Sequence, residues 1–406
     1  MLSIIVINFN QNAQLYAASI LTPSLLTELN LSYALGGTLI SAYMLSLALV
    51  ITPAGMIGDK LGGRLVFLAG AAFMSAGSLS LTLAGDFNLA FLSRVITGIG
   101  AAAVITMTGP ITSYWFDVRQ FRVVHGMGTA ISKIGAVFST WVMPPLILAL
   151  GWRLGYGVLS LAGPISLVVG LALLTSKPTD VGLPAMQLWV DPRATAEGAE
   201  ADRCLGVWQL LRLRSMVPLC IASLFYFGAY FGAVNWVPTY MARVLGMNSV
   251  EGGFETGMIV WGTVIGYAIT GPAANRLGRC RPLYLGGLAC TGCLTALFAT
   301  AVPQLPAWVL PPLLLLNGLA FSGLLLMTPM LAVLVPRGSL ATGSGIVFTT
   351  SYLGAVALPP LIGAAADLTG SLAVAFWLPA ACGFLGVLAA LFIHEPTYPT
   401  GPSVAH

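Results

Sequence analysis

Two long apolar runs are joined by a short charged turn with the sequence Gly55-Met56-Ile57-Gly58-Asp59-Lys60-Leu61-Gly62-Gly63-Arg64. A second copy of this turn begins about 216 positions later, at Gly271, and contains Asn275, Arg276 and Gly278. In both copies a glycine is followed four residues later by Asp or Asn, and then by a basic residue and another glycine. Two such turns in a strongly apolar chain indicate a membrane protein with an internal duplication.

The composition also indicates a membrane protein. Of the 406 residues 57% are hydrophobic and only 7% are charged, and the mean hydropathy is +0.91. Soluble domains carry charge on about a quarter of their residues. The net charge of +4 is too small to favour nucleic-acid binding, and no basic segment precedes the first apolar run, so no cleavable signal peptide is predicted. Cys290 and Cys293 have a C-x-x-C spacing, but in an apolar run this favours helix packing over a redox or metal site.

Runs of about 20 apolar residues are long enough to cross a bilayer as helices. Twelve are predicted, in two groups of six, at 3–27, 33–55, 65–85, 88–113, 123–149, 154–174, 215–241, 253–273, 282–302, 308–333, 343–365 and 372–393. We therefore expect an all-α integral membrane fold of two pseudo-symmetric six-helix bundles, at 1–174 and 215–393, joined by a linker at 175–214 and followed by a tail at 394–406. The linker is expected to end in a short amphipathic helix around Trp208, lying at the membrane surface.

The distribution of basic residues predicts the orientation, because cytoplasmic loops are enriched in Lys and Arg. Only Arg153 and Arg243 fall on one side of the predicted spans. The other side carries thirteen basic residues: Lys60, Arg64, Arg119, Arg122, Lys177, Arg193, Arg203, Arg212, Arg214, Arg276, Arg279, Arg281 and Arg337. The charged turns, the linker and both termini are therefore expected in the cytoplasm, with the chain in the inner membrane.

Further landmarks repeat at nearly the same offset. Pro23 corresponds to Pro238, and Pro144-Pro145 corresponds to Pro359-Pro360. The predicted relation between the two bundles is an axis along the membrane normal, with a substrate path between them.

The chain resembles the major facilitator superfamily over essentially its whole length. The resemblance is carried by the charged turn at Gly55–Arg64, by Arg94-x-x-x-Gly98-x-Gly100, and by the glycine and proline series that ends at Pro144. The segments 177–184 and 235–240 are similar to the anion:cation symporter and organophosphate antiporter branches. In organophosphate carriers, arginines on the first and seventh spans clamp the phosphate. Neither span has an internal arginine here, and Tyr230 stands near the second of these positions, so the resemblance implies a carboxylate or another small anion.

Lys133 is the strongest candidate for a substrate-binding residue. It lies about ten residues into the fifth predicted span, near mid-membrane, where a charged side chain costs about 2.5–3.5 kcal/mol on insertion scales. No Asp or Glu lies at mid-depth in any predicted span. Lys133 is therefore expected to act as the counter-charge of an anionic substrate. The alternative is a neutral lysine, or one solvated in a wet cavity.

Polar and aromatic side chains on other spans are further candidates. Asn8, Asn12 and Tyr16 recur at helical spacing on the first span, and polar amides that face lipid are costly. The other candidate substrate-binding residues are Tyr226, Tyr230 and Asn235 on the seventh span and Trp261 on the eighth. Interhelical hydrogen bonding is the alternative role for each of them.

Titratable groups that could couple transport to protons are few. Arg94 on the fourth span is expected to be structural, as a donor to a neighbouring helix, or to take part in coupling, as the resemblance implies. Glu255 is expected to be a surface or gate residue near the outer side. The co-transported or exchanged ion is therefore left open.

The charged turns are predicted to be gates rather than substrate sites. The gating residues are Gly55, Asp59, Lys60, Arg64, Asn275 and Arg276. Because Asn275 replaces the carboxylate of Asp59, we expect an asymmetric gate in which Asp59→Asn lowers turnover more than Asn275→Ala does.

The sequence thus predicts a secondary active transporter that moves a small organic anion by alternating access, without a cofactor and as a monomer. No ATP-binding loop, nucleophile–base pair or metal-ligand cluster is recognisable, so neither a pump nor an enzyme is expected. The alternatives are a multidrug or metabolite exporter of the same superfamily, or a membrane sensor that does not transport.

Overall fold

A computed structural model of the chain describes residues 2–113, 115, 118–175, 205–335 and 339–395. Most of the linker and the C-terminal tail lie outside these ranges. Within the described helices, some side chains are likewise not described, among them those of Asp59 and Asn275.

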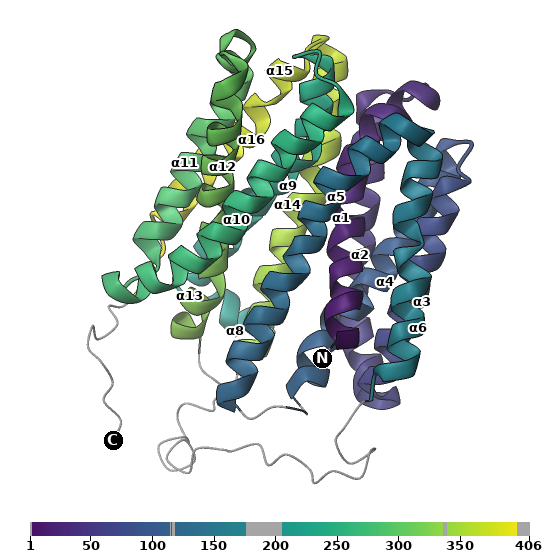
Figure 1. Ribbon diagram of the computed structural model, residues 1–406. Coiled ribbons are helices and arrows are strands. Elements are labelled where there is room, and N and C mark those ends of the chain that lie inside the picture. The colour runs from purple at the N-terminus through teal and green to yellow at the C-terminus, as the bar shows by residue number, and fades with distance from the viewer. Residues whose placement is uncertain (1, 114, 116–117, 176–204, 336–338, 396–406) are drawn as a thin grey trace, which may run out of the picture. The chain divides into compact units, whose positions relative to one another are not determined.

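The described residues form helices and no strand (Figure 1). The helices are α1 (Leu2–Glu28), α2 (Tyr33–Leu61), α3 (Gly63–Thr82), α4 (Phe87–Ser113), α5 (Val118–Ser160), α6 (Ala162–Leu173), α8 (Val207–Leu211), α9 (Met216–Arg243), α10 (Ser249–Leu277), α11 (Arg281–Thr300), η2 (Val302–Gln304), η3 (Ala307–Val309), α12 (Leu310–Phe321), η4 (Ser322–Leu326), α13 (Met327–Leu334), α14 (Leu340–Thr369), α15 (Leu372–Ala375) and α16 (Trp377–Ala390). Helices satisfy their backbone polar groups internally, as a lipid environment requires. The predicted all-α membrane fold is confirmed.

Ten stretches of the described residues are long and apolar enough to cross a membrane, against twelve predicted. The difference arises at two places. The polar helix α1 is not among the ten, and the stretch Ile131–Leu173 covers two predicted spans. Inside this stretch Gly151 has φ +77°, a left-handed backbone that favours glycine, and it divides α5 into two helical segments.

The chain forms two compact units. Unit 1 consists of Met1–Val190, Val234–Gly257 and Pro359–Leu372, and unit 2 consists of the remaining residues. Unit 1 therefore contains the end of α9, the beginning of α10 and the end of α14 in addition to the N-terminal helices. The domain boundaries drawn from the sequence remain a prediction.

The core of unit 1 is built on α1, which packs along α5. One face of α1 contributes Ala13, Ala17 and Leu21, which pack with Trp152 and Tyr156 beyond the break in α5. These side chains are nearly inaccessible to solvent. Small residues on α1 thus let the large aromatic side chains of α5 fill the space between the helices.

Two close helix crossings in unit 1 occupy corresponding places in the repeat. At the first, α2 meets α14: a Cβ on Gly37 would lie 2.6 Å from Cα of Pro360, and the indole of Trp236 donates to the carbonyl of Pro359 at 3.0 Å. At the second, α10 meets α5: a Cβ on Gly253 would overlap Pro144. Each crossing therefore requires glycine on one helix opposite proline on the other.

Candidate functional site

The polar face of α1 is buried inside unit 1. Asn8 donates from its side-chain amide to Oγ1 of Thr108 on α4 at 2.9 Å, and also to the carbonyl of Ile4. Asn12 donates to the carbonyl of Asn8 at 3.0 Å. Tyr16, the third predicted residue of this face, is 2% exposed. The amides of this stripe are thus engaged within the unit, and the partner on α4 was not predicted from the sequence.

Arg94 lies in a second polar cluster of unit 1, which the hydrogen bond from Asn12 to Oε1 of Gln11 at 3.1 Å joins to the first. Its guanidinium donates to the carbonyl of Gln14 at 3.4 Å and lies 4.8 Å from the centre of the Tyr43 ring. The hydroxyl of Tyr156 donates to Oε1 of Gln14 at 2.7 Å, and the amide of Gln11 donates to the hydroxyl of Tyr43 at 3.0 Å. A backbone carbonyl and an aromatic face thus contact this buried cation, while its Nε has no hydrogen-bond partner among the described residues.

Lys133 is only half-buried, and it has neither a hydrogen bond nor an ion pair with any residue that the structure describes. It shares one face of α5 with Val137, Thr140 and Pro144, which follow at helical spacing. The Thr140 end of this face packs on α10, where a Cβ on Gly257 would lie 3.0 Å from Oγ1 of Thr140. Lys133 therefore stands about 10 Å from this crossing, on the α10-facing stripe of α5.

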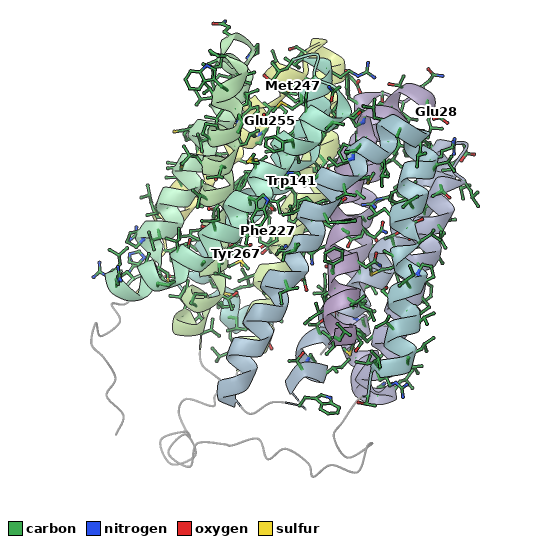
Figure 2. The ribbon with its side chains drawn as sticks, in the orientation of Figure 1. Glu28, Trp141, Phe227, Met247, Glu255 and Tyr267 are labelled. Carbon is green, nitrogen blue, oxygen red and sulfur yellow. The ribbon has the colours of Figure 1, made fainter. Side chains whose placement is uncertain are left out.

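The α5–α10 crossing also involves aromatic side chains, with Trp141 stacked on Phe254 at a centroid distance of 5.6 Å (Figure 2). Along α10, Trp261 continues the face of Gly253 and Gly257 by one further turn. Glu255 points to another side of α10 and is 7% exposed, and its Oε2 has no hydrogen-bond partner among the described residues. The expectation that Glu255 lies at the surface was therefore wrong, and its role as a gate residue remains a prediction.

The candidate residues of α9 are all buried. In unit 2 the hydroxyl of Tyr226 donates to the carbonyl of Ala320, and Tyr230 packs edge-on against Phe321 at 4.5 Å between centroids. In unit 1 Asn235 is 4% exposed. The hydroxyl of Tyr226 is thus already hydrogen-bonded to Ala320 within unit 2.

The first charged turn packs on α4 and reaches α6. A Cβ on Gly63 would lie 3.2 Å from Ile111, and Nη2 of Arg64 donates to the carbonyl of Leu171 near the end of α6 at 3.4 Å. Gly55 lies nearest Thr106 of α4, and Lys60 is exposed. The side chain of Asp59, the predicted gating residue with a carboxylate, is not described, so its role stays a prediction.

The second charged turn, in unit 2, makes the corresponding connection. Arg281 donates to the carbonyls of Ala390 and Leu391 at the end of α16, the latter at 2.6 Å, and Glu395 accepts from the backbone amide of Cys280 at 2.9 Å. Arg276 is exposed, and the side chain of Asn275 is not described. In each half a basic side chain thus binds the last carbonyls of a later helix, where a cation is favoured.

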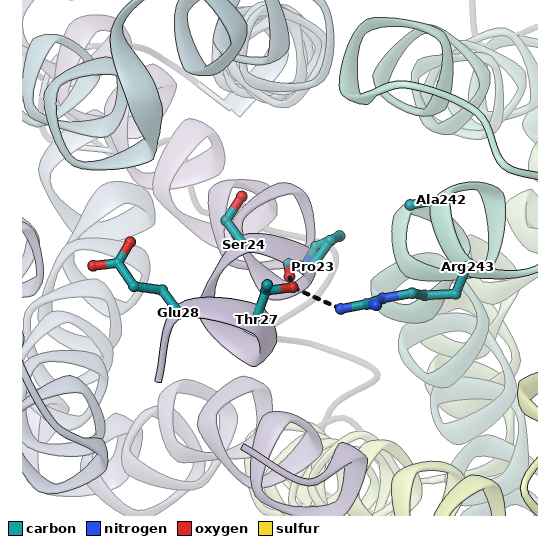
Figure 3. A pocket seen from close by; sticks show the side chains of 6 residues that line it. All are labelled: Pro23, Ser24, Thr27, Glu28, Ala242 and Arg243. Atoms are coloured by element: carbon teal, nitrogen blue, oxygen red, sulfur yellow. Dashed lines mark hydrogen bonds between the residues drawn. The ribbon is translucent and has the colours of Figure 1, made fainter. Parts of the chain in front are cut away.

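Charged side chains also gather where α1 ends. A pocket of about 490 Å³ is lined by Pro23, Ser24, Thr27, Glu28, Ala242 and Arg243, and Arg243 donates to Oγ1 of Thr27 at 2.6 Å (Figure 3). Glu28 accepts from the indole of Trp152 and pairs with Arg153 at 2.7 Å. The hydrogen bond from Trp152, and then those from Arg153, hold the pKa of the Glu28 carboxyl below its usual range.

Metal or cofactor binding has no candidate group among the described residues, where no cluster of three or more His, Cys, Asp or Glu side chains occurs. Cys290 and Cys293 are both free on α11. At the end of the linker, Trp208 of the short helix α8 is 79% exposed and Leu210 is fully buried. The amphipathic helix at the membrane surface stays a prediction.

The family model of the Major Facilitator Superfamily matches residues 2–359. The "Probable L-galactonate transporter" of Escherichia coli (strain K12) is 24% identical over 406 residues, with 96% of this chain and 86% of that protein covered. The "Tetracenomycin C resistance and export protein" of Streptomyces glaucescens is 23% identical, with 66% of this chain and 57% of that protein covered. Among solved structures, the nucleoside transporter NupG is similar at a TM-score of 0.78 and 14% identity, with 97% of this chain and 99% of that one covered.

Proposed function

The chain belongs to the major facilitator superfamily, and from this premise we propose that it is a secondary transporter that moves a small organic anion across the cytoplasmic membrane by alternating access. The family and fold are those of multi-pass membrane transporters, which are not enzymes. A small-molecule substrate follows from the family. The anionic character of the substrate is the part that the residues of the chain must support.

The observation that carries the proposal is the state of Lys133. A lysine in a membrane span is costly, and such residues face a cavity or a partner. Lys133 is half-buried on α5 and has no partner among the described residues. A carboxylate substrate supplies the missing counter-charge, and its charge-assisted hydrogen bond to the ammonium group offsets the cost of the buried lysine.

The relatives support the same substrate class. Galactonate appears in the name of a relative that matches 96% of this chain. It carries one carboxylate and several hydroxyl groups. Lys133 would bind the carboxylate. Hydroxyl groups need polar partners, and the sequence predicts amide, phenol and indole groups for this role at Asn8, Asn12, Tyr16, Tyr230, Asn235 and Trp261. That each of these residues binds substrate remains part of the proposal, and Tyr226 is the weakest candidate because its hydroxyl donates to the carbonyl of Ala320.

Uptake into proteoliposomes tests the proposal. Radiolabelled L-galactonate is offered to the purified full-length chain, with neutral galactose as the matched control that lacks the carboxylate. We expect saturable galactonate uptake that other small carboxylates inhibit and galactose does not. Faster uptake into vesicles preloaded with carboxylate would identify exchange. Uptake that no carboxylate inhibits would exclude an organic-anion transporter.

A second candidate function is the export of larger aromatic compounds. The similarity to a resistance and export protein favours it, and so do the aromatic side chains of α9 and α10. The absence of an acidic side chain at mid-depth in the predicted spans counts against an exporter of cations. Drug-dependent fluorescence quenching in inverted vesicles separates the two functions, because only an exporter would accumulate an aromatic antibiotic there.

The orientation with cytoplasmic termini is also a proposal, and it rests on the basic residues of the charged turns and the linker. We also propose that the protein works as a monomer and that an ion, not yet identified, is co-transported or exchanged. Protease access to the C-terminal tail in inverted vesicles, but not in intact cells, is the expected result.

A further inference from the structure

The two corresponding crossings of unit 1 differ in how the helix that begins there is capped. The first amide groups of a helix have no partner within the helix, so they need an acceptor from elsewhere. At the beginning of α2 the acceptor comes from a distant part of the chain. At the beginning of α10 it comes from the adjacent residue.

Asp367 caps α2. Its Oδ1 accepts from the amide of Tyr33 at 3.0 Å, and its Oδ2 accepts from the amide of Ala34 at 2.8 Å, across 334 and 333 positions of sequence. Both oxygens of the carboxylate are therefore used, and its negative charge lies at the positive end of the α2 dipole. The two helices can approach this closely because Gly363, one turn before Asp367, has no Cβ. A Cβ there would overlap the backbone of Tyr33.

Asn248 caps α10 from its own chain segment. Its Oδ1 accepts from the amides of Val250 at 2.9 Å and Glu251 at 3.0 Å, while Glu251 accepts from the amide of Asn248 at 3.0 Å. This reciprocal arrangement is a local capping box, and it persists wherever α10 moves. Position 152, which corresponds to Asp367 in the repeat, is a tryptophan that binds Glu28.

We propose that Asp367 is a latch that holds the end of α14 against the beginning of α2 in the state seen here, and that it biases the conformational equilibrium of the transport cycle toward this state. When the two helices separate, α2 keeps only the local cap of Ser32, which accepts from the amide of Leu35 at 3.3 Å. The amides of Tyr33 and Ala34 then lose a charged acceptor, whereas the local cap of α10 stays intact when α10 separates from α5. This proposal rests on the proposed function in one respect: the separation of α2 from the end of α14 is taken to be part of alternating access.

A helix cap typically changes an equilibrium about fivefold when it is removed. A contact made in one conformation and absent from the other shifts the population by that differential amount. Asp367→Ala is therefore expected to raise the ratio of separated to closed molecules about fivefold. Asp367→Asn, which keeps one amide acceptor and loses the charge, is expected to raise it less.

Spin labels test the proposal in the full-length chain in lipid nanodiscs, with the six native cysteines replaced by serine. Labels at Leu83 and Leu368, which are 76% and 88% exposed, report the distance from the end of α3 to the end of α14. The matched control is Asp86→Ala. Asp86 is an exposed aspartate that caps α4 locally by accepting from the amide of Leu89 at 2.8 Å.

A longer-distance population that grows with both Asp367 variants and not with Asp86→Ala supports the latch. An unchanged distance distribution in both Asp367 variants overturns it, and so does equal growth with Asp86→Ala. No substrate is added in this experiment. Its outcome is therefore independent of whether the protein carries organic anions.

Discussion

Two basic side chains of unit 1 occupy contrasting surroundings. Arg94 is 3% exposed, and a carbonyl and an aromatic ring contact its guanidinium. Lys133 is half-buried and has no partner among the described residues. Both cations lie in membrane-spanning helices without a nearby acidic partner in the described part of the chain.

The difference separates a structural cation from a candidate binding residue. The guanidinium of Arg94 already contacts a carbonyl of α1 and the ring of Tyr43, although its Nε has no hydrogen-bond partner among the described residues. These contacts connect α4 with α1 without a ligand. The ammonium of Lys133 has no such acceptor among the described residues, so a substrate anion would stabilise it more than it would stabilise Arg94. Buried charge alone therefore does not distinguish the two residues, whereas the lack of a described partner makes Lys133 the candidate for substrate binding.

The largest effect is expected at Lys133. Lys133→Gln removes the charge that the substrate carboxylate pairs with, and truncation of one partner of such a pair lowers affinity by about 100-fold. Galactonate uptake should fall accordingly, while the amount of protein in the membrane and its gel-filtration profile stay unchanged. Lys133→Arg is the control that keeps the charge and should retain part of the uptake. Unchanged substrate affinity in Lys133→Gln would assign Lys133 to structure, as for Arg94.

Arg94→Ala should act on stability rather than on binding. Loss of a large buried side chain costs about 2–4 kcal/mol through the cavity left behind. The melting temperature in detergent is expected to fall, while the substrate affinity of the folded protein stays within about threefold. Arg94→Met, which fills most of the volume, should recover much of the loss. A large change in affinity at normal stability would instead place Arg94 in the coupling machinery.

Tyr43→Phe separates the contribution of the Tyr43 ring from that of its hydroxyl. It keeps the ring beneath the guanidinium and removes the hydroxyl that accepts from Gln11. The expected cost is one buried hydrogen bond, about 1 kcal/mol, measured by thermal unfolding. A cost as large as that of Arg94→Ala would mean that the hydrogen-bond network, and not the packing of Arg94, maintains this cluster.

The smallest effect is expected when the ion pair of a third basic residue, Arg153, is broken by changing its carboxylate partner Glu28. Both side chains are more than a third exposed, so Glu28→Gln should cost only about 0.5 kcal/mol. Because the pKa of Glu28 is lowered on folding, its contribution is present above the unfolded pKa of about 4.3 and is lost as the pH falls through the folded value. The melting temperatures of Glu28→Gln and the parent protein should therefore differ at pH 7 and converge below about pH 4. A constant difference down to pH 3 would contradict a stabilising role for the charge.

The sequence by itself determined the family, the all-helical membrane fold and the internal repeat. Hydrophobicity, helical backbone bonding and the spacing of glycine and proline are local properties, so they can be read along the chain. The polar face of Asn8 and Asn12 and the exceptional position of Lys133 belong to this group. The count of spans differs from the twelve predicted, because α1 is too polar to count among the ten candidate spans and the stretch divided at Gly151 counts as one.

Only the tertiary structure decided which polar groups are already engaged. Asn8 binds Thr108 across 100 positions, Arg94 reaches the carbonyl of Gln14 across 80, and Asp367 caps α2 across 334. Such partners depend on which helix faces meet, and no local pattern encodes that meeting. The same reason explains Glu255, which a position near a helix end placed at the surface and which packing buries. The charged turn of Gly55–Arg64 identified the family, and the helix contacts distinguished Arg94, which has partners, from Lys133, which has none among the described residues.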